Sequence, residues 1–282
     1  MRGSPSGALA SLRSLGSGMT PALRKIADYV QNDPEQLLYQ TVVEVAEASG
    51  SSEASVIRFC RDLGFSGFQD FKLALASDLA ASPVGLSPQE DPRTPEEALE
   101  YVAHHAQQAI QDTRSLLDLK AVGEAVRLIL KAKRIDIYGV GASGVTAQDF
   151  AYKFLRLGYA AQSYTDPHLA AMSAATLGDG ALALAITRSG TTIDTVKALE
   201  LARRSGAKTL AVTARLKSPV ARAADVVLVT SVAESPLTGG SVAAKIGQLL
   251  ALDLLYTLVA LRRKEGQAFI SRTAAAVSDR NY

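Results

Sequence analysis

The stretch Ala181–Thr192 reads A-L-A-L-A-I-T-R-S-G-T-T, an apolar run that ends in hydroxyl side chains around one glycine. A short buried run of this kind, followed by a helical pattern from Ile193, indicates a strand that enters a helix. Further apolar runs at 134–138, 209–212 and 226–229 alternate with helical patterns. This alternation predicts an α/β fold in which helices cover both faces of a parallel sheet.

The loop after the first predicted strand reads G-V-G-A-S-G over residues 139–144, and a helical pattern from Val145 to Leu157 follows it. Glycines at a helix N-terminus present backbone N–H groups that suit a phosphate. The same letters satisfy the G-x-G-x-x-G pattern of dinucleotide-binding folds, and Asp166 lies near the distance expected of a ribose-binding acid. Such a loop also occurs where it only closes a packed strand–helix unit, so three interpretations remain open.

The loop after residue 186 is the stronger indication of a ligand, because four hydroxyl groups surround Gly190, with Arg188 as a possible counter-charge. The hydroxyl-bearing residues are Thr187, Ser189, Thr191 and Thr192. Serine and threonine are ordinary helix caps, which would explain one or two of them. Loops after parallel strands meet at the carboxyl edge of the sheet, so this loop and the one at 139–144 predict an anion site there.

Residues 81–95 separate two parts of different composition. They contain four prolines and few apolar residues, which is typical of a linker. The sequence therefore predicts a helical domain at 1–80 and an α/β domain at 96–282, which begins with two helices over 96–132. In the first domain, Thr20 and Pro21 predict the start of a helix.

Residues Thr41 to Leu63 predict two helices joined by a tight turn at Ser49–Gly50. The small side chain of Ala46 would let the helices approach, and Val56 would fill the angle between them. In a helix-turn-helix the N-terminal part of the second helix enters the major groove of DNA. The candidate DNA-binding residues are Ser52, Glu53, Ser55, Arg58 and Arg61.

The charge of residues 1–80 argues against DNA binding. Acidic residues slightly outnumber basic ones in 1–80, whereas phosphate neutralisation normally needs a basic surface. Arg58 and Arg61 are then solvated charges on an outer face. Dimerisation would place two DNA-binding domains on successive half-sites of the DNA, so that few contacts per subunit suffice.

The run A-E-A-S-G-S-S-E-A-S-V-I-R-F-C-R-D-L-G-F-S-G-F-Q-D-F-K, Ala46–Lys72, resembles the helix-turn-helix signature of the RpiR family of bacterial transcriptional regulators. The resemblance extends upstream through T-P-A-L-R-K-I-A-D-Y-V, Thr20–Val30. It implies a double-stranded DNA operator as a partner and a homodimer or higher homo-oligomer.

Residues 119–262 resemble a SIS, or sugar isomerase, domain, with Ser143 as the serine of its G-x-G-x-S loop and Ser189–Thr192 as its S-G-x-T loop. The resemblance implies that these loops hold the phosphate of a sugar phosphate. Thr187 stands where many members have serine, which keeps the hydroxyl. The implied ligand residues are Gly141, Ala142, Ser143, Thr187, Ser189, Gly190, Thr191, Thr192 and Glu234, followed by Ser241 and Lys245 as weaker candidates. Glu234 is equally consistent with a solvated loop charge.

Two functions follow from these resemblances. One is a transcriptional regulator of carbohydrate metabolism without catalytic residues, whose SIS domain senses a sugar phosphate. The other is a sugar-phosphate isomerase with an accessory helical domain, in which Glu234 or His168 would be the base. A dinucleotide-dependent enzyme would leave the hydroxyl-rich second loop unexplained.

Composition excludes several other classes. A net charge of +2 over 282 residues gives no global basic field. Cys60 and three histidines are too few for a disulfide framework or a zinc site, and no cofactor is expected. No signal peptide or apolar run of membrane-spanning length is present, so we expect a cytoplasmic protein without a membrane partner. Residues 246–261 are expected to form a buried or subunit-interface helix.

Overall fold

The computed structural model describes residues 8–13, 19–81, 94–231 and 242–278. It contains two compact units, and the division between them in the described chain lies at Tyr101 and Val102. Most of the predicted linker, residues 82–93, lies outside the described residues. Helix α6 (Phe68–Ala81) ends directly before that segment, and helix α7 (Pro95–Leu116) begins directly after it.

The N-terminal unit is helical, and local sequence signals set where its helices begin. Besides α6 it contains α1 (Ala8–Arg13), α2 (Pro21–Asn32), α3 (Pro34–Leu38), α4 (Val42–Ala48) and α5 (Glu53–Asp62). Thr20 accepts a hydrogen bond from the backbone N–H of Leu23 at the start of α2, as predicted. At the start of α4, Thr41 and Glu44 form a reciprocal capping box, which satisfies two backbone donors. The buried side chains of these helices form one core.

Cys60 lies in this core and is fully buried. Burial raises the pKa of its thiol to about 12, so the reactive thiolate is scarce near neutral pH. We expect the native protein to resist an aromatic disulfide reagent, and the protein unfolded in guanidinium chloride to react rapidly. Absorbance of the released thiol measures both rates. Equal rates in the two states would contradict the burial.

The second unit contains a five-stranded sheet in the order β2-β1-β3-β4-β5, and every pair of neighbours is parallel. The strands are β1 (Arg134–Tyr138), β2 (Ala160–Tyr164), β3 (Ala181–Ile186), β4 (Lys208–Thr213) and β5 (Val226–Val229). The predicted α/β fold with a parallel sheet is confirmed. Strand β2, which is not among the predicted strands, lies at an edge of the sheet and is partly exposed along its length.

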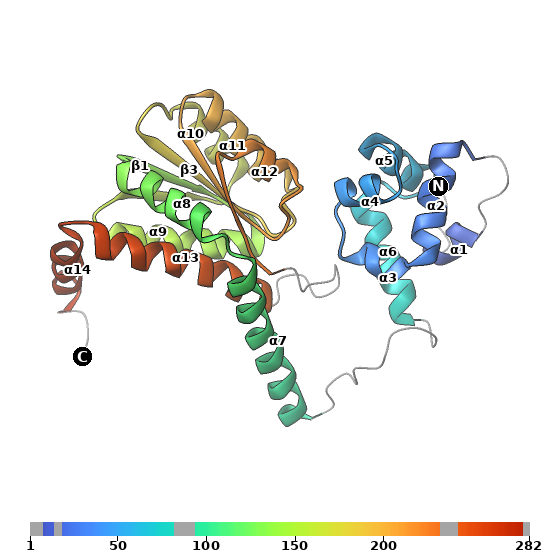
Figure 1. Cartoon of the computed structure of the whole chain (residues 1–282), viewed down its shortest axis with the longest axis horizontal. Coiled ribbons are helices and arrows are strands. Elements are labelled where there is room, and N and C mark those ends of the chain that lie inside the picture. Colours follow the sequence, from blue (N-terminus) through green and yellow to red (C-terminus); the bar gives the residue numbers. More distant parts are fainter. Residues whose placement is uncertain (1–7, 14–18, 82–93, 232–241, 279–282) are drawn as a thin grey trace. The chain divides into compact units, whose positions relative to one another are not determined.

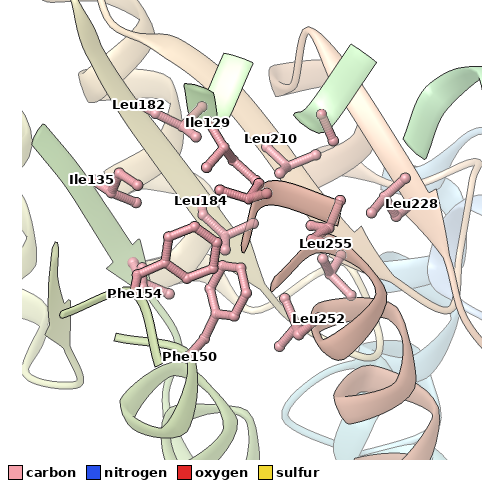
Figure 2. Close-up of a cluster of buried hydrophobic side chains, with 14 of the residues drawn as sticks. Ile129, Ile135, Phe150, Phe154, Leu182, Leu184, Leu210, Leu228, Leu252 and Leu255 are labelled. Atoms are coloured by element: carbon pink, nitrogen blue, oxygen red, sulfur yellow. The ribbon is translucent and has the colours of Figure 1, made fainter. Parts of the chain in front are cut away.

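Helices cover both faces of this sheet, as Figure 1 shows. One face packs against α8 (Leu119–Lys131), α9 (Gly141–Arg156) and α13 (Val242–Arg262), and their apolar side chains form the larger core of the unit. In Figure 2, Phe150 and Phe154 of α9 and Leu252 and Leu255 of α13 gather beside Leu184 of β3. The two helices expected over 96–132 are confirmed as α7 and α8.

The opposite face packs against α10 (Pro167–Ala175), α11 (Ile193–Arg204) and α12 (Pro219–Ala223), through a core rich in alanine. Helix α14 (Gly266–Ala275) follows α13. No helix within the described ranges is long and apolar enough to cross a bilayer.

The strand order sets where a ligand would bind. From β1 the chain passes to β2 on one side of it, and then to β3 on the other side. Open α/β sheets bind ligands beyond the carboxyl ends of the strands at the point where the strand order reverses, which here lies between β1 and β3. Both loops that the sequence singles out follow these two strands.

Candidate functional site

The loop after β1 is shorter than the sequence suggests, because α9 begins at Gly141 and not at Val145. Gly139 and Gly144 are packed against each other: a Cβ on Gly139 would lie 2.9 Å from the Ser143 carbonyl oxygen, and one on Gly144 would lie 3.0 Å from the Gly139 oxygen. These two glycines close the strand–helix unit. Gly141 has a φ of +58°, which glycine adopts most easily.

Ser143 lies in the first turn of α9 and is held by a residue that sequence analysis missed as a site residue. The side-chain amide of Gln248, on α13, donates a hydrogen bond of 3.2 Å to Ser143 Oγ. The hydroxyl of Thr146 donates one of 3.1 Å to the Gln248 amide oxygen. Gln248 and Thr146 are both buried. The only signal in the sequence is an amide inside the apolar run 246–261.

The loop after β3 gathers its hydroxyl groups by hydrogen bonds. Thr187 Oγ1 and Thr192 Oγ1 are 3.0 Å apart, and Ser189 Oγ accepts hydrogen bonds from the backbone N–H and the hydroxyl of Thr191. Gly190, at the bend, has a φ of +69°. Its carbonyl accepts a hydrogen bond of 3.0 Å from the backbone N–H of Val220 at the start of α12. The conformation of Gly190 therefore lets this loop pack against the start of α12.

The helices that follow these two loops begin without a side-chain cap. In α2, α3, α4, α5, α8 and α10, a side-chain oxygen at the N-cap accepts a hydrogen bond from the first turn. The N-cap residues of α9 and α11, Val140 and Thr192, make no such bond; the same is true of the short α12 and of α14. At the starts of α9 and α11, therefore, no N-cap side chain occupies the first backbone N–H groups, and these groups and the positive end of the helix dipole suit an anion.

We call residues 141–143 and 187–192 the anion cradle. The strands before its two halves are hydrogen-bonded neighbours, with Tyr138 in register with Ala185, so both halves leave the sheet at the same edge. The structure thus brings eight of the nine predicted ligand residues to this edge. The ninth, Glu234, lies outside the described residues, as does Ser241. Lys245 is half-buried in the first turn of α13.

A small recess, which no pattern in the sequence indicates, lies beside the cradle. Its polar lining comes from Tyr138, Tyr164, Asp166, Asp194 and Thr195. Burial raises the pKa of Tyr138 far above its usual value, so its phenol stays neutral. Thr195 Oγ1 is buried and has no hydrogen-bond partner among the described residues.

The start of α10 contains Asp166, the candidate ribose-binding acid, and His168, a candidate base of an isomerase. Asp166 caps this helix, because its carboxylate accepts a hydrogen bond of 2.9 Å from the backbone N–H of Leu169. That capping bond is a structural role for a residue that the dinucleotide hypothesis assigned to a ribose. His168 is exposed in the first turn of the same helix.

In the N-terminal unit, α4 and α5 are joined by the predicted tight turn. Gly50 has a φ of +60°, and a Cβ added to it would meet nothing within 4 Å, so glycine is required there for its backbone freedom and not for space. Ala46 and Val56 are buried where the helices approach. Their burial agrees with a helix-turn-helix.

Three of the five candidate DNA-binding residues lie at the start of α5, and the two arginines lie further along the helix. The hydroxyl of Ser52 caps the helix by accepting from the backbone N–H of Ser55, and the two hydroxyl oxygens are 2.9 Å apart. Glu53 is half-buried. Arg58 and Arg61 are both exposed, and the Arg58 guanidinium lies 3.6 Å from the carboxylate of Asp62. The arginines are three positions apart and therefore share one side of the helix.

Comparison with known proteins supports the predicted helix-turn-helix and the predicted SIS domain. Residues 6–82 match the model of the helix-turn-helix domain of the rpiR family, and residues 128–258 match the SIS domain. An uncharacterized HTH-type transcriptional regulator of Caldanaerobacter subterraneus subsp. tengcongensis is 37% identical, over 90% of this chain and 91% of its own. The HTH-type regulator YbbH of Bacillus subtilis is 35% identical, over 96% and 97%.

A solved structure resembles the whole chain. It is the NanR protein of Vibrio vulnificus in complex with ManNAc-6P, with a TM-score of 0.88 and 33% sequence identity. The match covers 97% of this chain and 99% of the other. Both the order of the two parts and the fold of the sheet are therefore shared with the NanR chain.

Proposed function

This chain belongs to the rpiR family of helix-turn-helix regulators, and from that membership we propose that it controls carbohydrate metabolism by binding DNA and sensing a sugar phosphate. The helix-turn-helix at 1–80 would bind the operator, residues 81–95 would link the domains, and the SIS domain in 96–282 would bind the effector. We propose a homodimer as the acting form, because two reading heads would then contact successive half-sites. The cytoplasm, where such an operator is accessible, is the proposed location.

The uncapped starts of α9 and α11 are the observation that carries the effector proposal. Two helix N-termini and a cluster of hydroxyl groups lie at one edge of the sheet and present hydrogen-bond donors. A phosphate supplies the acceptor oxygens and negative charge that such a site binds. The structurally similar NanR is described with a hexosamine phosphate, so ManNAc-6P belongs at the front of a ligand panel.

The double substitution Ser143→Ala and Ser189→Ala tests the cradle. Each hydroxyl that donates to a charged phosphate contributes about 1.5–3 kcal/mol, so we expect the affinity for the best ligand to fall at least 100-fold. The measurement is the rise in melting temperature of the wild type and of the variant over a panel of sugar phosphates. DNA affinity without ligand should be unchanged. An undiminished thermal shift in the variant would refute the site.

We propose binding without catalysis at this site. An isomerase needs a base next to the carbonyl carbon of its substrate. The cradle contributes hydroxyls, backbone amides and Arg188, and none of these is an ordinary base near neutral pH. Of the two carboxylates in the recess beside it, that of Asp166 is engaged as a helix cap, which leaves Asp194 as the residue to replace if exchange is found. Exchange of substrate protons into deuterated water, followed by NMR for each sugar phosphate that binds, separates the two functions: exchange by the wild type would establish an isomerase.

A further inference from the structure

Gln248 of α13 is hydrogen-bonded to two residues of α9, and the two bonds follow one another in the same donor-to-acceptor direction. Thr146 donates to the Gln248 amide oxygen, and the Gln248 amide nitrogen donates to Ser143 Oγ. A hydroxyl has a single hydrogen, so Ser143, having accepted a bond from Gln248, has its own hydrogen left to donate. A phosphate oxygen accepts hydrogen bonds, and a chain of bonds with the same direction strengthens each member.

The residue before Gln248 on α13 contacts a different helix. Gly247 is buried, and a Cβ added to it would lie only 2.8 Å from Thr113 Oγ1 on α7. Thr113 is fully buried, and its hydroxyl accepts a hydrogen bond of 3.1 Å from the backbone N–H of Ser231, two residues after the end of β5. Glycine at position 247 therefore permits a close approach of α13 to α7.

Two adjacent residues of α13 thus face the cradle and α7, respectively. Helix α7 is also the first helix after the segment that follows the helix-turn-helix along the chain. In most of α13 the buried side chains are apolar, and burying an amide among them is unfavourable unless its hydrogen bonds are made. Movement of Ser143 would therefore require α13 to move with it or to lose that bond.

We propose that Gln248 is a positioning residue for the effector, and that the contact between Gly247 and Thr113 transmits occupancy of the cradle to α7. The proposal rests on the proposed function, because it assumes that the cradle binds a phosphate. Gln248 orients the Ser143 hydroxyl toward the phosphate. A change in the position of α13 on binding then alters the packing of α7, the first helix along the chain after the segment that follows the helix-turn-helix.

Hydrogen–deuterium exchange of the full chain, with and without inorganic phosphate, tests both steps. Phosphate is the group that the cradle recognises, whichever sugar carries it. In the wild type we expect phosphate to slow exchange at the starts of α9 and α11, and to change exchange around Gln248 and around Thr113. An effect at the cradle without any change in α7 would overturn the relay alone. No effect at the cradle would overturn the phosphate site, and the relay with it.

The substitution Gln248→Met keeps the length of the side chain and removes both hydrogen bonds. We expect phosphate affinity to fall about tenfold, because Ser143 loses its orientation, and the response in α7 to disappear at saturating phosphate. Comparing each variant with and without phosphate separates this effect from a general loss of stability. Unchanged phosphate affinity in Gln248→Met would overturn the positioning role.

The substitution Gly247→Ala tests the second step with the cradle intact. Its Cβ would press on Thr113, so we expect wild-type exchange at the start of α9 and no response in α7. Adding Thr113→Ala removes the atom in the way and should restore part of that response. Gly123→Ala on α8 is the matched control, since nothing lies within 4 Å of a Cβ at Gly123. A wild-type response of α7 in Gly247→Ala would overturn the relay.

Discussion

The double substitution Arg58→Ala and Arg61→Ala is expected to reduce specific operator binding by at least 100-fold. Both side chains are exposed on one side of α5, the helix that would enter the major groove. An arginine that reads a base contributes about 1–3 kcal/mol, and a dimer would lose the contribution twice. Fluorescence anisotropy, with an operator selected from random DNA by the wild type, measures the loss.

Two control substitutions separate a loss of base reading from a simple loss of charge. Lys25→Ala removes one positive charge, half of what the double substitution removes, from an exposed position on α2 and should change affinity only slightly. Arg58→Lys keeps the charge but not the planar pair of donors, so it should lose specificity more than affinity for unrelated DNA. If the double substitution leaves operator affinity within a factor of two, α5 is not the recognition helix.

Gly190→Ala is expected to damage both stability and ligand binding. The added Cβ would lie 2.3 Å from Ser218 Oγ and 2.5 Å from Ser218 Cβ, and Ser218 is fully buried. A positive φ adds about 1–2 kcal/mol for a side chain, and overpacking about 1–3 kcal/mol more. We expect a loss of about 2–5 kcal/mol, a melting temperature lower by roughly 5–15 °C, and no thermal shift with sugar phosphates.

Gly206→Ala is the matched control for this prediction. Gly206 also has a positive φ, +95°, but the nearest atom to a Cβ added there would be 3.7 Å away. It therefore shares the backbone strain without the clash, and it lies at the other end of α11. Both variants should be less stable, but only Gly190→Ala should lose the response to ligand. Equal stability and equal response in the two variants would show that the packing against Ser218 is unimportant.

Features that depend on neighbouring residues could be predicted from the sequence. Thr20 and Ser52 cap their helices as expected, because a cap needs only a backbone donor two or three positions further along. The bend at Gly50 likewise follows from the backbone freedom of a single residue. Four of the five strands were also evident. The central strand β3 is apolar on both faces, as a buried strand in a parallel sheet is, and β1, β4 and β5 also lie at the expected runs.

Features that depend on distant parts of the chain were missed or misplaced. The edge strand β2 pairs on one side only and shows no continuous apolar run. The start of α9 was placed at Val145, because glycines normally disfavour a helix interior, whereas close packing of Gly144 against Gly139 allows α9 to begin at Gly141. The pairing of Gln248 with Ser143 spans 105 positions, and no local pattern predicts it.

The uncapped helix starts also bear on how long the regulator persists in a cell. An effector that binds there would supply the missing acceptors, and a ligand that binds only the folded chain lowers the population of unfolded molecules open to proteases. The abundance of the protein would then rise with the concentration of its effector, even where transcription of its own gene is constant. Sensing and turnover would be governed by the same few backbone N–H groups of α9 and α11.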